Sequence, residues 1–227
     1  VLDALAGAHR RDPFSLPDAD RSYRAAIHDS IDGYDIAASA DLNLFPIDER
    51  VRELVHEAST VFEEAGARVQ AVAPGFDHTR TEITDAFMLQ SNVGTAAFGD
   101  ALESTYDISI TGADRDAIPP SLLEQFEAGR DTGALEYRVA DEIRTNVFDT
   151  VQRVLEDHDL LVAASLMVPP FDKEVLERRP GPKTVAGTSL EDSKWGTLMD
   201  WRSTQITNMT GHPAASIPAG FVDGLPI

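Results

Sequence analysis

The pattern that most constrains the fold is a strand, a helix and a second strand within the first third of the chain. Residues 34–42 alternate enough apolar side chains for a strand, and a helix follows with Asp48 as its expected N-cap. Apolar residues recur along that helix at the spacing of one buried face: Val51, Leu54, Val55, Ala58, Val61, Phe62 and Ala65. Gly66 ends the helix, and residues 67–72 read as a second strand. A helix of ordinary length between two strands predicts a parallel sheet covered by helices.

Helical periodicity dominates the rest of the chain. Helices are expected over residues 81–103, 121–128, 134–157 and 195–207. The helix over 134–157 is expected to have one apolar face, formed by Leu135, Val139, Ile143, Val147, Val151, Val154 and Leu155. Residues 160–164 are an uninterrupted apolar run, which predicts a buried strand, and residues 216–221 predict a last strand before the hairpin signal Asp223-Gly224. The Pro- and Gly-rich stretch 168–188 predicts a loop. Because we find no internal repeat and no low-complexity linker, we expect residues 1–227 to form a single α/β domain.

Charge is the most extreme feature of the composition. The chain carries 39 acidic and 19 basic residues, which gives a formal net charge of −20. The acidic residues are spread along the expected helices, so they indicate a solvated acidic surface. This charge and the scarcity of lysine favour a halophilic protein, because concentrated salt screens the repulsion between acidic residues. The alternative is an ordinary acidic protein. Thermal unfolding midpoints measured from low to molar KCl would separate the two, since only a halophilic protein should become more stable as the salt concentration rises. Direct nucleic-acid binding is not expected, since phosphates require a basic face.

Several classes of site are absent from the sequence. The chain has no cysteine, which excludes disulfides, thiol catalysis and cysteine-ligated zinc. No two of its six histidines are three to five residues apart, so no metal site is expected. No apolar run approaches the roughly 18 residues of a membrane span, and no phosphate-binding glycine loop or Gly-x-Ser-x-Gly elbow is present. We therefore expect a cytoplasmic protein with no cofactor and no membrane contact.

The adjacent pair Ser193-Lys194 contains the residue types of a serine hydrolase that uses a neutral lysine as its base. It lies in an acidic loop, where Lys194 keeps its proton, and neighbouring residues on a loop do not preset a nucleophile–base geometry. No other nucleophile and base can be paired from the sequence. We therefore expect no catalytic residue in this chain.

The most specific segment is residues 208–220, Asn-Met-Thr-Gly-His-Pro-Ala-Ala-Ser-Ile-Pro-Ala-Gly. Asn208 and Thr210 can hydrogen-bond the backbone of their own turn, Gly211 permits a positive φ, and Pro213 directs the chain into the following strand. The segment resembles the Asn-x-Thr-Gly-x-Pro-Ala-x-Ser-x-Pro-x-Gly turn and strand of the amidase-signature family. Weaker matches follow the family's order: Leu2–Gly7 with Arg11–Ser15, Phe45–Asp48 with its helix, and Asp159–Leu161.

The resemblance covers the whole chain and implies the C-terminal half of an amidase-signature hydrolase, a partial domain cut at both ends. It implies a large, twisted, mixed sheet covered by helices, and cleavage of the carboxamide C–N bond of a small-molecule amide without a cofactor. The family's Ser nucleophile, its second Ser at a cis peptide and its Lys base belong to the N-terminal half and have no counterpart here. Ala163-Ala164-Ser165 replaces the usual Thr-Pro-Thr, a departure that puts a substrate contact at that turn in doubt.

Three residues beside the motif, Trp201, Thr204 and Asn208, are expected to bind substrate as one wall of the acyl pocket. Trp201 and Thr204 are three apart on the expected helix and would share a face, although a core aromatic is the alternative for Trp201. Two other functions stay open. One is the A subunit of an aspartyl/glutamyl-tRNA amidotransferase, which tends to present an acidic residue near the position of Trp201, where Asp200 stands. The other is a non-catalytic relic or binding module; a homodimer also stays open.

Overall fold

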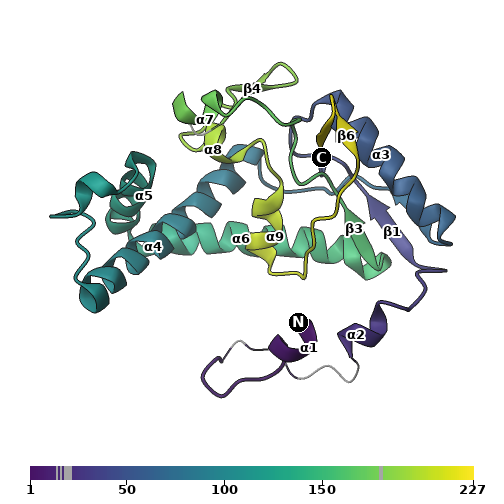
Figure 1. The fold of residues 1–227 in the computed structure, drawn as a ribbon, viewed down its shortest axis with the longest axis horizontal. Coiled ribbons are helices and arrows are strands. Elements are labelled where there is room, and N and C mark those ends of the chain that lie inside the picture. The colour runs from purple at the N-terminus through teal and green to yellow at the C-terminus, as the bar shows by residue number, and fades with distance from the viewer. Residues whose placement is uncertain (14, 16, 18–21, 179–180) are drawn as a thin grey trace.

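The computed structural model describes residues 1–13, 15, 17, 22–178 and 181–227, and at its centre is a three-stranded parallel sheet (Figure 1). The strands are β1 (Asp35–Ala38), β2 (Arg68–Ala71) and β3 (Leu160–Val162), in the order β2-β1-β3. Ile36 of β1 is opposite Val69 on one side and Leu160 on the other. The helix α3 (Glu49–Glu64) connects β1 to β2. The order strand, helix, strand is therefore confirmed. The first strand is shorter than the predicted residues 34–42, because residues 40–44 form a turn in which Leu42 and Asn43 have positive φ angles.

The helix α3 begins where the sequence predicts. The side chain of Asp48 accepts a hydrogen bond from the backbone N–H of Arg50 at 3.0 Å, which is the expected N-cap. Val51 and Val55 are buried, whereas Val61 is 60% exposed. Because sixteen helical residues extend further than four-residue strands, the last turns of α3 project beyond the sheet.

Three helices separate β2 from β3, namely α4 (Arg80–Tyr106), α5 (Pro120–Asp131) and α6 (Ala134–Asp157), with a 3₁₀ turn at Arg115–Ala117. Thr79 and Glu82 form a capping box at the start of α4. Figure 1 shows α4 and α6 extending together away from the sheet, with α5 packed on the far part of α4. Gly129 allows this close packing, because a Cβ at that position would lie 2.0 Å from the carbonyl oxygen of Asn92.

The order of the strands determines which face each helix covers. The connection through α3 moves from β1 to β2, and the connection through α6 moves back across β1 to β3. Since both crossovers are expected to be right-handed, α3 and α6 lie on opposite faces of the sheet. Figure 1 shows them on either side of β1 and β3. The largest core cluster joins the two sides and includes Val51, Val55, Ile83, Val147 and Val151.

Three expectations for the middle of the chain need correction. The bounds of α6 are as predicted, but the expected apolar face is only partly covered: Leu135 is 84% exposed and Val139 is 58% exposed. Leu160 of β3 is 42% exposed, because β3 is an edge strand of the described sheet. The expected loop 168–188 contains the short helix α7 (Glu174–Arg178) and a hairpin of β4 (Thr184–Val185) with β5 (Thr188–Ser189), while Pro180 lies outside the described residues.

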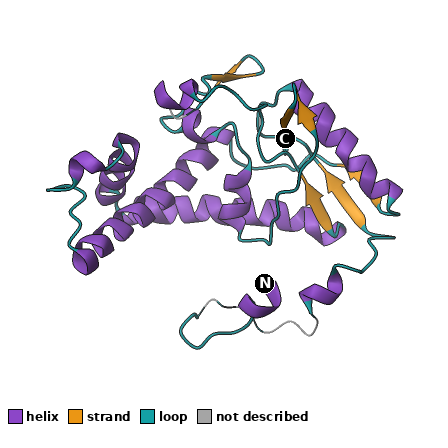
Figure 2. Cartoon of the chain, viewed as in Figure 1, coloured by secondary structure: helices purple, strands orange, loops and turns teal. Residues whose placement is uncertain are grey.

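The two ends of the chain differ in how well the sequence predicts them. The C-terminal hairpin is confirmed: β6 (Phe221–Val222) pairs with β7 (Leu225–Pro226) across Asp223 and Gly224, whose φ angles are 51° and 79°. Residues 216–220 form no strand, and Pro218 has no N–H for a sheet ladder; Figure 2 shows this stretch as loop. Near the N-terminus lie α1 (Leu2–Leu5) and α2 (Tyr23–Ala26), while Phe14 lies outside the described residues. No helix in the described part of the chain is long and apolar enough to cross a bilayer.

Candidate functional site

The helix expected at residues 195–207 is broken in the middle. The structure has α8 (Gly196–Met199) and α9 (Thr204–Thr210), separated by four residues. The backbone of this break pairs with the chain that follows β3: the Met167 N–H donates to the Trp201 carbonyl at 2.8 Å, and the Ser203 N–H donates to the Ser165 carbonyl at 3.1 Å. These bonds use backbone groups that a continuous helix would have paired internally. The prediction that Trp201 and Thr204 share one helix face is therefore wrong.

Trp201 lies in the core. Its side chain is 8% exposed and its indole N–H donates to the Thr197 carbonyl at 3.1 Å. Its ring meets Phe171 edge-on, with a centroid distance of 5.2 Å, and the guanidinium carbon of Arg202 lies 4.3 Å from the ring centroid. The structure therefore separates Trp201 from the surface on which the other two expected site residues lie.

Thr204 and Asn208 lie one turn apart on the exposed side of α9. The opposite side of α9 buries Gln205, Ile206 and Met209 against the core. Gly211 ends the helix with φ +70°, so the positive φ expected at that position is confirmed. The exposed side of α9, between the break before it and the glycine after it, thus has the uncharged polar side chains of Thr204 and Asn208, with Thr207 exposed beside them.

A second polar group lies beside this face, at the carboxyl end of β3. Ser165 follows β3 by three residues, and its hydroxyl is 3.2 Å from the hydroxyl of Ser216, which belongs to the motif segment. The Ser165 carbonyl also accepts from the Ser203 N–H, immediately before Thr204. We call Ser165, Thr204, Asn208 and Ser216 the strand-end site. The sequence does not show that Ser165 and Ser216 meet, because 51 positions separate them.

The topology of the sheet gives this location a physical meaning. After β1 the chain passes to α3, whereas after β3 it passes through α7, β4, β5 and α8 before it reaches α9, which packs on α6. Since α3 and α6 cover opposite faces, the connections leaving β1 and β3 diverge at their carboxyl ends. In open α/β sheets ligands bind in the crevice that such divergence produces. Ser165 lies at this edge of the sheet, and the four residues of the strand-end site have uncharged polar side chains, which can hydrogen-bond a neutral polar ligand.

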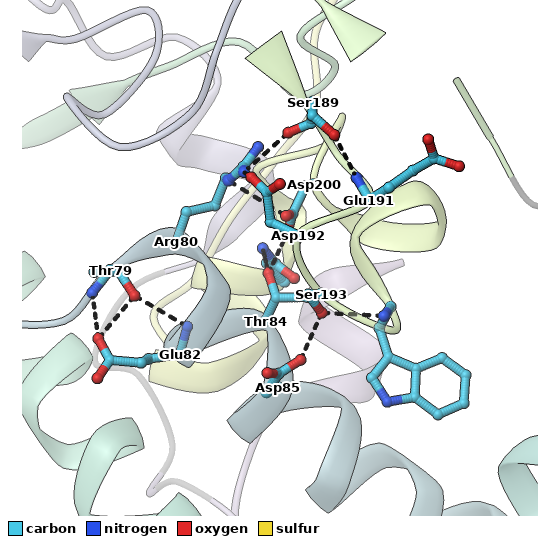
Figure 3. Close-up of polar contacts among 12 residues, drawn as sticks. Thr79, Arg80, Glu82, Thr84, Asp85, Ser189, Glu191, Asp192, Ser193 and Asp200 are labelled. Atoms are coloured by element: carbon cyan, nitrogen blue, oxygen red, sulfur yellow. Dashed lines mark hydrogen bonds and ion pairs between the residues drawn. The ribbon is translucent and has the colours of Figure 1, made fainter. Parts of the chain in front are cut away.

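Below this surface, a buried polar network connects α4 to the break between α8 and α9 (Figure 3). Asp200 is fully buried, and its Oδ1 accepts a hydrogen bond from the Thr84 hydroxyl. The Gln205 side-chain amide donates to the same hydroxyl oxygen at 3.0 Å. Nε of Arg80 lies 3.3 Å from Oδ2 of Asp200, and the guanidinium also contacts Asp192 at 3.4 Å. The network holds Asp200, and with it the start of the break, against α4.

The environment of Asp200 opposes its ionisation. Burial raises the pKa of the Asp200 carboxyl above its ordinary value, while the Thr84 hydrogen bond and the Arg80 charge act in the opposite direction. In such a buried site, the ionised form of the carboxyl is stabilised only by the hydrogen bonds and opposite charges of its partners. The sequence shows Asp200 only as an acidic residue beside a tryptophan, and its partners Arg80 and Thr84 lie more than 100 positions away.

Ser193 and Lys194 do not form a catalytic pair in this structure. The Ser193 hydroxyl donates to the Asp85 carboxylate at 2.6 Å and accepts from the Trp195 N–H at 3.0 Å (Figure 3). The Lys194 ammonium lies 3.1 Å from a Glu124 carboxylate oxygen and 4.6 Å from the Trp195 ring centroid. The Ser193 hydroxyl is therefore directed to a carboxylate and not to Lys194, so the two residues are not arranged as a nucleophile and its base.

Comparison with known proteins agrees with this architecture. The family model described as Amidase matches residues 1–227. The acylamidase of Rhodococcus erythropolis is 30% identical over 229 residues, which cover 100% of this chain and 44% of that protein. The crystal structure of a bacterial aryl acylamidase of the amidase signature family superposes with a TM-score of 0.86 at 31% identity, covering 97% of this chain and 44% of that one.

A second group of relatives consists of A subunits of glutamyl-tRNA(Gln) amidotransferases. The A subunit of the glutamyl-tRNA(Gln) amidotransferase of Haloarcula marismortui is 27% identical over 243 residues, which cover 100% of this chain and 54% of that protein. The chain thus spans about half the length of the curated relatives it matches. The family model matches every residue of the chain, and a solved structure of the family superposes along nearly its whole length. The chain therefore belongs to the amidase-signature family.

Proposed function

We propose that the full-length protein containing this chain hydrolyses the C–N bond of a neutral acylamide, and that the strand-end site forms one wall of its acyl pocket. The observation that carries this proposal is the uncharged polar face of Thr204, Asn208, Ser165 and Ser216 at the carboxyl edge of the sheet. Hydroxyl and amide groups can hydrogen-bond a carbonyl or an amide N–H without requiring charge on the ligand. The similarity to acylamidases along the whole chain supports the same activity.

The nucleophile and base are proposed to come from residues outside this chain. Ser165 and Ser216 contact each other, and the Ser203 hydroxyl donates to the Ala164 carbonyl. In the described part of the chain, none of these three hydroxyls is hydrogen-bonded to a basic side chain. Activation of a serine requires such a base, so this chain is assigned substrate positioning and not the bond-breaking chemistry.

The position of Asp200 favours acylamide hydrolysis over the amidotransferase alternative. An acidic residue that binds the amine of glutamine must have a free carboxylate facing the substrate. Asp200 is instead fully buried and engaged by Thr84 and Arg80. It therefore supports the fold beneath the strand-end site and is not available to an amine ligand there.

The test is an assay of the full-length protein with two substrates. We expect it to release p-nitroaniline from p-nitroacetanilide and to release no ammonia from glutamine. Initial rates would be measured by absorbance for the first reaction and by a coupled ammonia assay for the second. Glutamine hydrolysis without anilide hydrolysis would contradict the proposal and favour the amidotransferase function.

A further inference from the structure

Residues 212–220 lie between the end of α9 at Gly211 and the start of β6, and we call them the crossing segment. Because α9 packs on α6 whereas β6 packs on α3, this segment passes from one face of the sheet to the other (Figure 1). Along the way the Ser216 hydroxyl meets the Ser165 hydroxyl beyond the carboxyl end of β3. The crossing segment therefore contributes one residue of the strand-end site.

The middle of the crossing segment has few contacts that could fix its path. Residues 213–218 are all exposed, and none of them makes a backbone hydrogen bond to another residue in the described part of the chain. Pro213 and Pro218 have no N–H to donate. The position of Ser216 thus depends on what holds the segment at its two ends.

The first end of the crossing segment is held on α6 by His212. Its ring stacks on Phe148, with a centroid distance of 4.9 Å and an angle of 11° between the ring planes, and its Nε2 lies 3.2 Å from Oε1 of Gln152. Phe148 and Gln152 are one helical turn apart. One turn before Phe148, Nε of Arg144 donates to the Met209 carbonyl at 2.6 Å. One stripe of α6 therefore holds both the end of α9 and the start of the crossing segment.

The ring nitrogens of His212 are not available for proton transfer at the strand-end site. Because an amide oxygen only accepts hydrogen bonds, Nε2 donates to Gln152. Nδ1 is buried and has no hydrogen-bond partner among the described residues. A general base must reach the proton that it removes, and neither nitrogen is hydrogen-bonded to Ser165 or Ser216. What His212 supplies is an attachment to α6.

The other end of the crossing segment is held on α3. The backbone of Gly220 lies against Leu54, since a Cβ at Gly220 would be 2.8 Å from Cδ1 of that leucine. Just beyond, Asp223 of the hairpin pairs with Arg50 at 2.9 Å. The side chains of this pair are 52% exposed for Arg50 and 78% exposed for Asp223, and exposed ion pairs contribute little to stability. The ion pair is therefore a useful comparison for the stacked ring at the first end.

We propose that His212 is a positioning residue for amide hydrolysis: by stacking on Phe148 it fixes the path of the crossing segment and so holds Ser216 in the wall of the acyl pocket. The inference rests on the proposed function, because it takes Ser216 to be part of that wall. A displacement of about 1 Å in an active site is enough to change catalysis substantially. His212 is thus expected to influence acyl preference through Ser216, without touching the substrate.

The experiment measures acyl preference in the full-length protein, as the ratio of kcat/KM for the acetyl and hexanoyl amides of p-nitroaniline. His212→Ala should change this ratio by about three- to tenfold, since a displaced wall fits the two acyl groups differently. His212→Phe keeps a ring that can stack on Phe148 and should restore most of the preference. Ser216→Ala should change the ratio as well. Adding His212→Ala to Ser216→Ala should then have little further effect, because two residues that act through one contact are not additive.

Asp223→Asn is the control at the other end of the segment. It removes the ion pair with Arg50, while asparagine tolerates the φ of 51° at this position, so the ratio should not change. If His212→Ala alters both substrates by the same factor, or if its effect on the ratio persists in full in the Ser216→Ala background, the proposal is overturned.

Asn208→Ala, measured with the same two substrates, separates this inference from the proposed function. A changed ratio in Asn208→Ala with an unchanged ratio in His212→Ala would overturn the positioning role alone. Unchanged ratios in both variants would overturn the positioning role and the proposed pocket wall together.

Discussion

Trp201→Ala is expected to lower the free energy of unfolding by about 3–5 kcal/mol, because it removes a large buried ring and leaves a cavity. The ring is 8% exposed, it packs edge-on against Phe171, and its N–H is paired with the Thr197 carbonyl. A loss of this size is a large part of the roughly 5–15 kcal/mol that stabilises a typical domain. Chemical denaturation of the full-length protein, followed by far-ultraviolet circular dichroism, would measure it.

Trp195→Ala is the matched control for this prediction. The same residue type is removed, but Trp195 is only partly buried and its ring contacts the exposed Lys194. Its loss should therefore cost clearly less stability than the loss of Trp201. Equal effects for the two variants, or a Trp201→Ala effect below about 1 kcal/mol, would contradict the assignment of Trp201 to the core.

Asp200→Ala is expected to cost about 3–5 kcal/mol, since removal of one member of a buried charged network leaves its partners without compensation. Arg80 would lose its closest carboxylate, and the Thr84 hydroxyl would lose its acceptor. Thermal and urea unfolding of the variant would measure the change. Asp192→Ala serves as the control, because Asp192 also contacts Arg80 but its side chain is 59% exposed. Similar small losses for both variants would show that the network does not stabilise the fold.

The pH dependence of Asp200→Asn tests the charge state of the same network. Because burial raises the folded-state pKa of Asp200, protonation favours folding, and this contribution is complete below the unfolded pKa of about 3.9. It is lost as the pH rises from there through the folded-state pKa. Wild-type stability should therefore fall relative to Asp200→Asn as the pH increases above about 4. A difference between the two proteins that is constant with pH would show that the folded and unfolded pKa values are equal.

The sequence predicts those parts of this molecule in which local pattern determines structure. The stripe of α3 and its cap at Asp48 are local features, and so is the Asp223-Gly224 hairpin; the structure confirms the cap, the hairpin and the buried start of the stripe. The long helix α6 has the predicted bounds, but its burial does not follow from its periodicity: Leu135 and Val139 extend past the elements that cover Val147. Periodicity identifies the helix face that can be buried. The length of the neighbouring elements determines how much of that face they cover.

The site is less predictable because long-range contacts build it. The propensity of residues 195–207 favours one helix, yet the chain breaks between α8 and α9, where its backbone pairs with the residues after β3. This break places Trp201 in the core and leaves Thr204 and Asn208 exposed. The turn at Ser165 departs from the family pattern, but the structure brings its hydroxyl to Ser216. None of these contacts leaves a periodic signal in the sequence.

The most direct test of the central claim, that the exposed face of α9 contacts the acyl group, is kcat/KM for anilides of increasing acyl length. Thr204→Val and Asn208→Ala in the full-length protein should change the preference between short and long acyl groups by about tenfold, because a pocket wall contributes differently to each substrate. Thr60→Val, at an exposed threonine of α3, should leave the preference unchanged. If the two α9 variants alter all substrates by the same factor, as Thr60→Val is expected to do, α9 does not line the acyl pocket and the account is wrong.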